Sequence, residues 1–470
     1  MTELWELGVG EAADAIRIGA VTAEQLAQTL LARIADHGEL NAFIAIDGDQ
    51  VLSAARAADR TRARAGALPP LHGVPLVLKD NLDTAGLPTT GGTPGLRSNR
   101  PARDAVVVAK LVAAGALVLG KANLHELAYG ITSNNAAFGP VRNPYAPSRI
   151  AGGSSGGTAA AVAARLAPGG IGTDTGGSVR IPAALCGIVG FRPTTGRWSQ
   201  QGIVPISHTR DTAGPMARGV ADCALLDSVV CDTTTAQSAL PAQGLRLGVP
   251  RRHFWEGLDR ELQTIAAAAL ERFRDAGVVL VDVDFGDAVA LDSTAGFPIA
   301  LFETVTDLNR YLAEHGSDLD FAELAAKTAS PDVRGILQNL TGAGAIADTV
   351  YRNALEEQRP ALQESYRRQF REHGIAALVL PTTPAPAVAL GEDETVTING
   401  VAMPTFLTFI RNCSPGSVAG IPGLSLPAGL TASGLPVGIE IDGPAGADQQ
   451  LLAIGAALEP LLPRLPAPFA

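Results

Sequence analysis

Two glycine- and serine-rich segments on either side of an alanine-rich run constrain this chain more than any other feature. The first segment is Gly152 to Gly157, the second is Gly172 to Arg180, and the run between them, Thr158 to Arg165, favours a helix. A helix that leads away from the first turn, followed by a returning strand, would bring Ser154 close to Ser178. The spacing therefore permits these two hydroxyl groups to share one site.

The surrounding pattern predicts an α/β fold. Residues 74–78 form a short apolar run that ends at Lys79, which fits a buried strand with a charged group at its carboxyl end. Residues 104–114 favour a helix and residues 116–119 a strand, so helices and strands alternate. We expect one large domain, residues 1–470, in which a mixed, mostly parallel β-sheet is sandwiched between helices. The more charged residues 245–390 are expected to form a peripheral helical layer within it.

Composition excludes several classes of partner. The 470 residues include 36 Lys and Arg against 47 Asp and Glu, a net charge of −11, which disfavours nucleic acid and anionic membranes as partners. The four cysteines contain no CxxC pair and are predicted to be reduced. Acidic residues occupy the first turns, where an export signal would carry positive charge. These features predict a cytoplasmic protein with no membrane span.

Lys79 is the candidate base for a serine nucleophile. A serine hydroxyl needs such a base near neutral pH, and an uncharged lysine can serve. Burial at the end of an apolar strand disfavours the ammonium form and lowers the lysine pKa. A shift from about 10.4 to about 7.4 costs roughly 4 kcal/mol. A lysine that follows a strand is more often solvated and a glycine–serine turn more often caps a helix, so only the combination favours catalysis.

Other motifs give weaker signals. The pattern G-x-S-x-G at Gly152 to Gly156 is typical of a nucleophile elbow with a histidine base. The late histidines, His315 and His373, lie in charged helical stretches, so we interpret this match as accidental. His125 has no second histidine at helical spacing, which favours a hydrogen-bonding role over a metal site. The glycines match no established phosphate-binding pattern, so a nucleotide site is a distant alternative.

Taken together, the segments resemble the amidase signature family. The resemblance rests on Gly73 to Asp80, Gly152 to Gly157 and Gly172 to Arg180, which agree in order and spacing, and it covers most of the chain. Residues His125 to Asn135 and Phe191 to Thr194 are most similar to the mandelamide and indoleacetamide hydrolases of that family.

The resemblance implies a catalytic set. Ser178 would be the nucleophile, Ser154 a proton relay that follows a cis peptide bond, and Lys79 the neutral base. The backbone N–H groups of four residues would face the developing oxyanion, where one lost donor typically costs roughly 2.7 to 4 kcal/mol of barrier: Thr175, Gly176, Gly177 and Ser178. Four further residues would support the set through hydrogen bonds and ion pairs: Ser155, Thr173, Asp174 and Arg180.

The implied reaction is hydrolysis of a small amide to a carboxylic acid and ammonia, with no metal or cofactor. The resemblance favours an aryl or arylacetic primary amide, and we expect five side chains to contact it: Tyr129, Thr132, Phe297, Phe302 and Phe409. Alternatives are a broad aliphatic or biuret-type amidase, a glutamine-dependent amidotransferase A-type subunit, and a non-catalytic assembly or binding subunit. A homodimer is possible.

Overall fold

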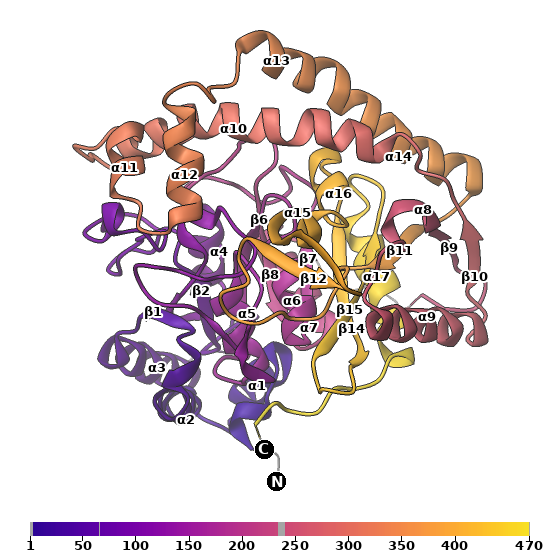
Figure 1. Ribbon diagram of the computed structural model, residues 1–470. Coiled ribbons are helices and arrows are strands. Elements are labelled where there is room, and N and C mark those ends of the chain that lie inside the picture. The colour runs from indigo at the N-terminus through magenta and orange to yellow at the C-terminus, as the bar shows by residue number, and fades with distance from the viewer. Residues whose placement is uncertain (1–2, 65, 234–239, 470) are drawn as a thin grey trace.

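A single twisted sheet of eleven strands runs through the molecule (Figure 1). The computed structural model describes residues 3–64, 66–233 and 240–469. From one edge to the other, the strands are β1 (Phe43–Ala45), β3 (Leu117–Ala122), β2 (Pro75–Lys79), β6 (Gly169–Asp174), β8 (Thr212–Ala217), β7 (Val189–Arg192), β14 (Gly423–Leu430), β15 (Pro436–Asp442), β11 (Ala377–Pro381), β9 (Arg246–Val249) and β10 (Val279–Asp282). Two small hairpins join β4 (Arg142–Asn143) to β5 (Ala146–Ile150) and β12 (Thr395–Ile398) to β13 (Val401–Pro404).

The sheet is mixed, as expected, but it is not mostly parallel. Six of its ten strand pairs are antiparallel, and four are parallel. The centre of the sheet explains the difference: β14 and β15 form a hairpin, and β8 lies antiparallel to both β6 and β7. The short connection between β14 and β15 favours antiparallel pairing, whereas parallel pairs need a longer crossover.

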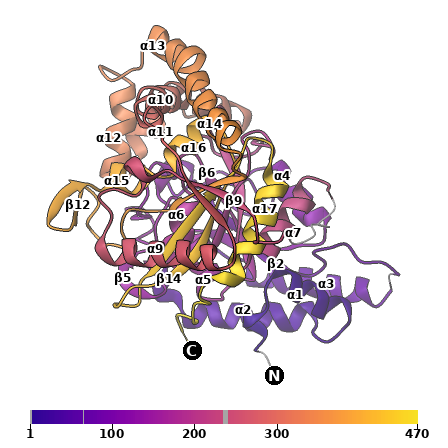
Figure 2. The ribbon, with the colours of Figure 1, turned by 90° about the vertical axis from the view of Figure 1, so that its right-hand side faces the viewer.

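Helices cover both faces of the sheet (Figure 2). On one face α5 packs against β2 and β6, and α6 packs against β14 and β15; on the other face lie α1, α7 and α17. The helices are α1 (Val9–Arg17), α2 (Ala23–Asp36), α3 (Gly48–Arg62), α4 (Val106–Ala113), α5 (Gly156–Ala163), α6 (Arg180–Cys186), α7 (Val220–Val230), α8 (Arg251–Phe254), α9 (Arg260–Asp275), α10 (Ala288–Glu314), α11 (Phe321–Lys327), α12 (Pro331–Leu340), α13 (Asp348–Asn353), α14 (Arg359–His373), α15 (Thr405–Ile410), α16 (Ser414–Ala419) and α17 (Asp448–Leu458). Single 3-10 turns cover Leu4–Glu6, Gly38–Leu40, Pro94–Leu96, Glu126–Ala128 and Glu459–Leu461, and a π turn covers Ala354–Gln358.

Residues 245–390 are only partly the helical layer expected from the sequence. Helices α10 to α14 form a layer beyond one end of the strands, at the top of Figure 1. The same range also supplies β9, β10 and β11 to the large sheet. Among the described residues, α10 alone has the length and apolar composition of a membrane-spanning helix. It packs against α14 and α16 and buries one face there, as a core helix does.

The parallel neighbours β2 and β6 fix where the functional groups meet. Both strands are fully buried, and both run toward the same edge of the sheet. Since the carboxyl ends of parallel strands lie together, Lys79 at the end of β2 comes close to Thr173 and Asp174 at the end of β6. The segments before α5 and α6 carry Ser154 and Ser178 to the same place.

Candidate active site

Lys79 is buried and bonded to two hydroxyl groups. Its side chain has no exposed surface. Its Nζ atom lies 2.7 Å from Oγ of Ser154 and 2.7 Å from Oγ1 of Thr173. Burial lowers the pKa of Lys79 to about 7, although the carboxylates of Asp174 and Asp211 oppose the shift. Near neutral pH, a large fraction of this lysine is therefore the uncharged amine, which can accept a proton.

Ser154 and Ser155 lie in the turn that leads into α5. The peptide bond between Gly153 and Ser154 is cis, as the resemblance implied. The carbonyl of Ser154 accepts a hydrogen bond from the backbone N–H of His125, at 3.1 Å. The hydroxyl of Ser155 donates to the carbonyl of Thr173 and accepts from its N–H, at 3.1 and 3.2 Å. Ser155 therefore joins this turn to the end of β6 and holds Ser154 against Lys79.

Ser178 forms the solvent-facing end of the group. It is 8% exposed and lines a cavity, whereas Ser154 has no exposed surface. The backbone N–H of Ser155 donates to the carbonyl of Ser178, at 3.2 Å, so the two turns are in direct contact. Among the described residues, the hydrogen bonds link Lys79 to Ser154 but include none between the hydroxyls of Ser154 and Ser178. The structure thus brings the three expected residues together. Of the two hydrogen bonds that the relay needs, it contains the one between Lys79 and Ser154.

A buried ion network holds the loop that carries Ser178. Arg180 donates to both carboxylate oxygens of Asp174, at 3.1 Å each, and Arg192 donates to one of them at 2.9 Å. Burial alone would raise the pKa of Asp174, but the two guanidinium groups hold it well below its usual range. Arg180 also donates to Glu440, at 2.5 Å, which ties the loop to β15. Asp174 and Arg180 are therefore paired, as the sequence suggested.

One of the four expected oxyanion donors already has a hydrogen-bond acceptor within the loop. The N–H of Gly177 donates to Oδ1 of Asp174, at 2.8 Å, so it is engaged within the loop and does not face the cavity. Thr175, Gly176 and Ser178 line the cavity. The carboxylate of Asp174 lies close enough to compete for the loop N–H groups, which the spacing of the motif could not reveal.

The cavity beside Ser178 has a volume of about 250 Å³ and mostly apolar walls. Two of the five expected substrate contacts, Tyr129 and Phe297, line it. The ring of Phe297 lies 6.2 Å from that of Phe406, and Phe406 lines the cavity too. Aromatic walls of this kind suit a flat apolar group.

The other three expected contacts lie elsewhere. Thr132 is buried behind the wall, with its hydroxyl 3.4 Å from Nδ1 of His125. Phe302 stacks on Tyr351 at a ring separation of 4.0 Å. Phe409 is fully buried in a neighbouring apolar cluster. Each residue belongs to a segment that borders the cavity, but its side chain points to a different packing partner.

Comparison with known proteins identifies the family. The profile of a family described as Amidase matches residues 25–452 of this chain. The chain belongs to the amidase signature family. The enzyme is therefore an amidase, and the likeness extends over nearly all of its length.

Several curated relatives are similar to this amidase. It is 45% identical over 435 residues to the indoleacetamide hydrolase of Agrobacterium vitis, which covers 93% of this chain and 92% of that protein. It is 41% identical over 480 residues to the mandelamide hydrolase of Pseudomonas putida, with 99% and 93% covered. Among solved structures, the peptide amidase from Stenotrophomonas maltophilia has a TM-score of 0.83 at 32% identity, with 98% of each chain covered.

Two charged residues of the amidase cavity were missed from the sequence. Arg210 lies just before β8 and Asp292 lies near the start of α10, and both line the cavity. Asp292 did leave a signal, because it is the only charged residue in the apolar run from Ala288 to Phe302. Arg210 left none, since nothing local distinguishes an Arg-Asp pair in a loop.

One group of side chains in the amidase has the composition of a metal site. Ligand atoms of His208, Glu303 and Asp307 lie within 4.8 Å of one another. The carboxylates already accept hydrogen bonds, Glu303 from Ser207 at 2.5 Å and from Tyr351 at 2.9 Å. His208 lies 2.9 Å from Asp307. The group lies outside the cavity lining, and these hydrogen bonds hold a loop onto α10.

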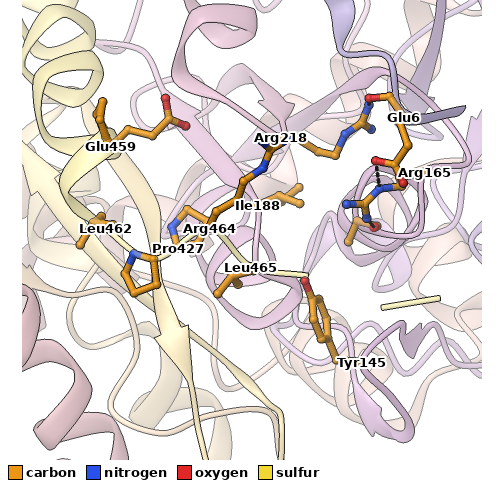
Figure 3. A pocket seen from close by; sticks show the side chains of 14 residues that line it. Glu6, Tyr145, Arg165, Ile188, Arg218, Pro427, Glu459, Leu462, Arg464 and Leu465 are labelled. Carbon is orange, nitrogen blue, oxygen red and sulfur yellow. Dashed lines mark hydrogen bonds and ion pairs between the residues drawn. The ribbon is translucent and has the colours of Figure 1, made fainter. Parts of the chain in front are cut away.

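A second cavity of the amidase, about 400 Å³ in volume, is lined by a mixture of charged and apolar residues (Figure 3). Arg165 pairs with Glu6 at 2.6 Å. Arg218 donates to the backbone carbonyls of Ala167 and Leu7 at 3.0 and 2.5 Å. These arginines tie the N-terminal segment to the chain that follows α5, so we interpret this cavity as structural.

Proposed function

We propose that this amidase hydrolyses a small aryl or arylacetic primary amide to the carboxylic acid and ammonia through an acyl-enzyme on Ser178. One observation carries the proposal. Lys79, whose pKa is lowered by burial, donates a hydrogen bond to Ser154, and the neighbouring turn carries Ser178, which lines a cavity with aromatic walls. The names of the relatives, indoleacetamide hydrolase and mandelamide hydrolase, support the substrate class.

Acylation begins with transfer of two protons. Oγ of Ser178 attacks the amide carbonyl carbon as its proton passes to Oγ of Ser154, and the proton of Ser154 passes to Nζ of Lys79. The hydrogen bond between the two serine hydroxyls is proposed to form when substrate binds, since catalytic hydrogen bonds often tighten in the complex. The oxyanion that forms is proposed to accept hydrogen bonds from the N–H groups of Thr175, Gly176 and Ser178.

The same relay completes the cycle. The C–N bond breaks as the departing nitrogen takes a proton from Ser154, which recovers one from Lys79, and ammonia leaves. Water then attacks the ester on Ser178 and gives a proton to the relay. The relay returns a proton to Oγ of Ser178 as the bond to the acyl group breaks and the acid leaves. Thr173 and Ser155 position the relay, and Asp174 with Arg180 fixes the loop.

A panel of amides tests the proposal. Purified protein would be incubated with indoleacetamide, mandelamide, phenylacetamide, an aliphatic amide and glutamine, and released ammonia would be measured. We expect aryl substrates to be preferred and the Ser178→Ala variant to be inactive. Turnover by Ser178→Ala would contradict the assignment, and release of ammonia from glutamine alone would favour an amidotransferase subunit.

The free thiols of the four cysteines support a reducing compartment such as the cytoplasm.

A further inference from the structure

A polar cluster interrupts the apolar wall of the substrate cavity, and the proposed mechanism does not use it. Its members are Arg210, Asp292 and Ser414, which line the cavity together with the aromatic residues. Ser414 donates a hydrogen bond to Oδ1 of Asp292, at 2.9 Å. Among the described residues, no donor contacts the other carboxylate oxygen, and Asp292 is partly exposed. One oxygen of Asp292 is therefore available to a ligand in the cavity.

Arg210 lies beside Asp292 and is buried. Its Nη1 donates to the carbonyl of Gly296, at 2.7 Å, and its Nε has no partner in the described part of the chain. A Cβ atom at Gly296 would lie 3.3 Å from Oδ1 of Asp292 and 3.4 Å from Nη1 of Arg210. Glycine at this position of α10 therefore leaves room for both side chains.

The guanidinium group of Arg210 favours the charged form of the Asp292 carboxyl group. Burial raises the pKa of Asp292 to about 6, and the nearby Arg210 and the Ser414 hydroxyl limit the rise. Near neutral pH the group is mainly a carboxylate, which accepts hydrogen bonds and donates none. The positive charge of Arg210 opposes binding of a cationic ligand at the same point.

We propose that Asp292 accepts a hydrogen bond from the acyl portion of the substrate, so that the cavity selects arylacetamides that carry an N–H or O–H donor there. The inference rests on the proposed function and names a narrower substrate class. A neutral donor group satisfies the free carboxylate oxygen, while the ring packs on Phe297 and Phe406. A plain hydrocarbon ring would leave that oxygen without a partner once water is displaced, and this costs binding energy.

Matched substrate pairs test the inference on the unmodified enzyme. Indole-3-acetamide would be compared with benzothiophene-3-acetamide, in which sulfur replaces the ring N–H, and mandelamide with phenylacetamide, which lacks the hydroxyl. We expect kcat/KM to favour the donor member of at least one pair by about 10- to 100-fold, the usual range for a hydrogen bond to a charged group. The pair that responds identifies the donor as the ring N–H or the hydroxyl. Equal values within both pairs would overturn the inference.

An Asp292→Asn variant assigns the effect to this residue. It keeps an acceptor for Ser414 but removes the charge, so we expect the ratio within the responding pair to fall to within about threefold. Asp287→Asn, an exposed carboxylate at the start of the same helix, is the control and should keep the wild-type ratio. An Asp292→Asn variant that lowers both members equally would show a structural role and reject the assignment. Absence of turnover on every amide would instead refute the proposed function itself.

Discussion

Nζ of Lys79 lies 2.7 Å from Oγ of Ser154, and neither side chain has any exposed surface. The residues are 75 positions apart. They reach each other because β2 pairs in parallel with β6, and Ser155 joins the turn that carries Ser154 to the end of β6. Lys79, the proposed base, is fully buried, while Ser178 lines the cavity. Burial therefore favours the uncharged amine, while Ser178, the proposed nucleophile, stays open to the cavity.

Replacement of Lys79 by methionine tests the base directly. The change keeps the volume of the side chain but removes the proton acceptor, so we expect kcat/KM for amides to fall by about 10³-fold or more. Folding should be retained, because the variant no longer buries an amine. Activity would be measured by ammonia release and folding by thermal unfolding. Lys110→Met, at a partly exposed lysine, is the control and should be fully active. Near-normal rates in Lys79→Met would reject the neutral-base mechanism.

The pH dependence of activity follows from the pKa of Lys79, which burial lowers to about 7. Below that value the amine binds a proton and cannot accept another from Ser154, so kcat/KM should fall as the pH is lowered through about 7. Above it, the rate should reach a plateau. The profile is best measured with phenylacetamide, which lacks the donor proposed to contact Asp292. A limb that lies near pH 4 would instead point to a carboxylate base.

Asp174 is expected to contribute strongly to the stability of the loop that carries Ser178. Asp174→Asn would leave Arg180 and Arg192 without their shared carboxylate in a fully buried site. Loss of one partner from a buried ion network typically costs about 3 to 5 kcal/mol of unfolding free energy. Urea unfolding would measure the loss. Asp282→Asn removes an exposed ion pair with Arg251 and should change stability by less than about 1 kcal/mol; similar losses in the two variants would contradict the role of the network.

The sequence was sufficient to predict that the three proposed catalytic residues meet at one place, because they lie in local motifs. Ser154 and Ser178 lie at helix starts within glycine-rich turns, and Lys79 ends an apolar run, so each position follows from short-range pattern. The prediction that most strand pairs are parallel was wrong, because local pattern shows where strands lie but not which strands become neighbours. The return of β8 between β6 and β7 is one such pairing.

The substrate wall was the least predictable part, since it depends on side-chain direction. Phe297 and Phe302 are five positions apart on α10, yet one lines the cavity and the other stacks on Tyr351. Rotation of 100° per residue separates their faces, and only the packing of α10 decides which face meets the cavity. The hydrogen bond from the Gly177 N–H could not be predicted for a similar reason, since only the fold shows Asp174 as its acceptor.

Gly177 combines a backbone conformation that favours glycine with close neighbouring atoms, and substitutions can separate the two effects. Its φ is +132°, and a Cβ atom there would lie 2.7 Å from Cδ1 of Ile181 and 2.8 Å from Cβ of Cys413. Gly177→Ala should therefore move the loop and lower kcat by about 100-fold, the size expected when an oxyanion donor is misplaced. Gly196→Ala is the matched control, since Gly196 also has a positive φ, of +87°, but no atom within 4 Å of the added Cβ. It should cost about 1 kcal/mol of stability and leave kcat unchanged. Steady-state kinetics and thermal unfolding of both variants would decide, and a Gly177→Ala enzyme with normal kcat would show that the loop tolerates the side chain.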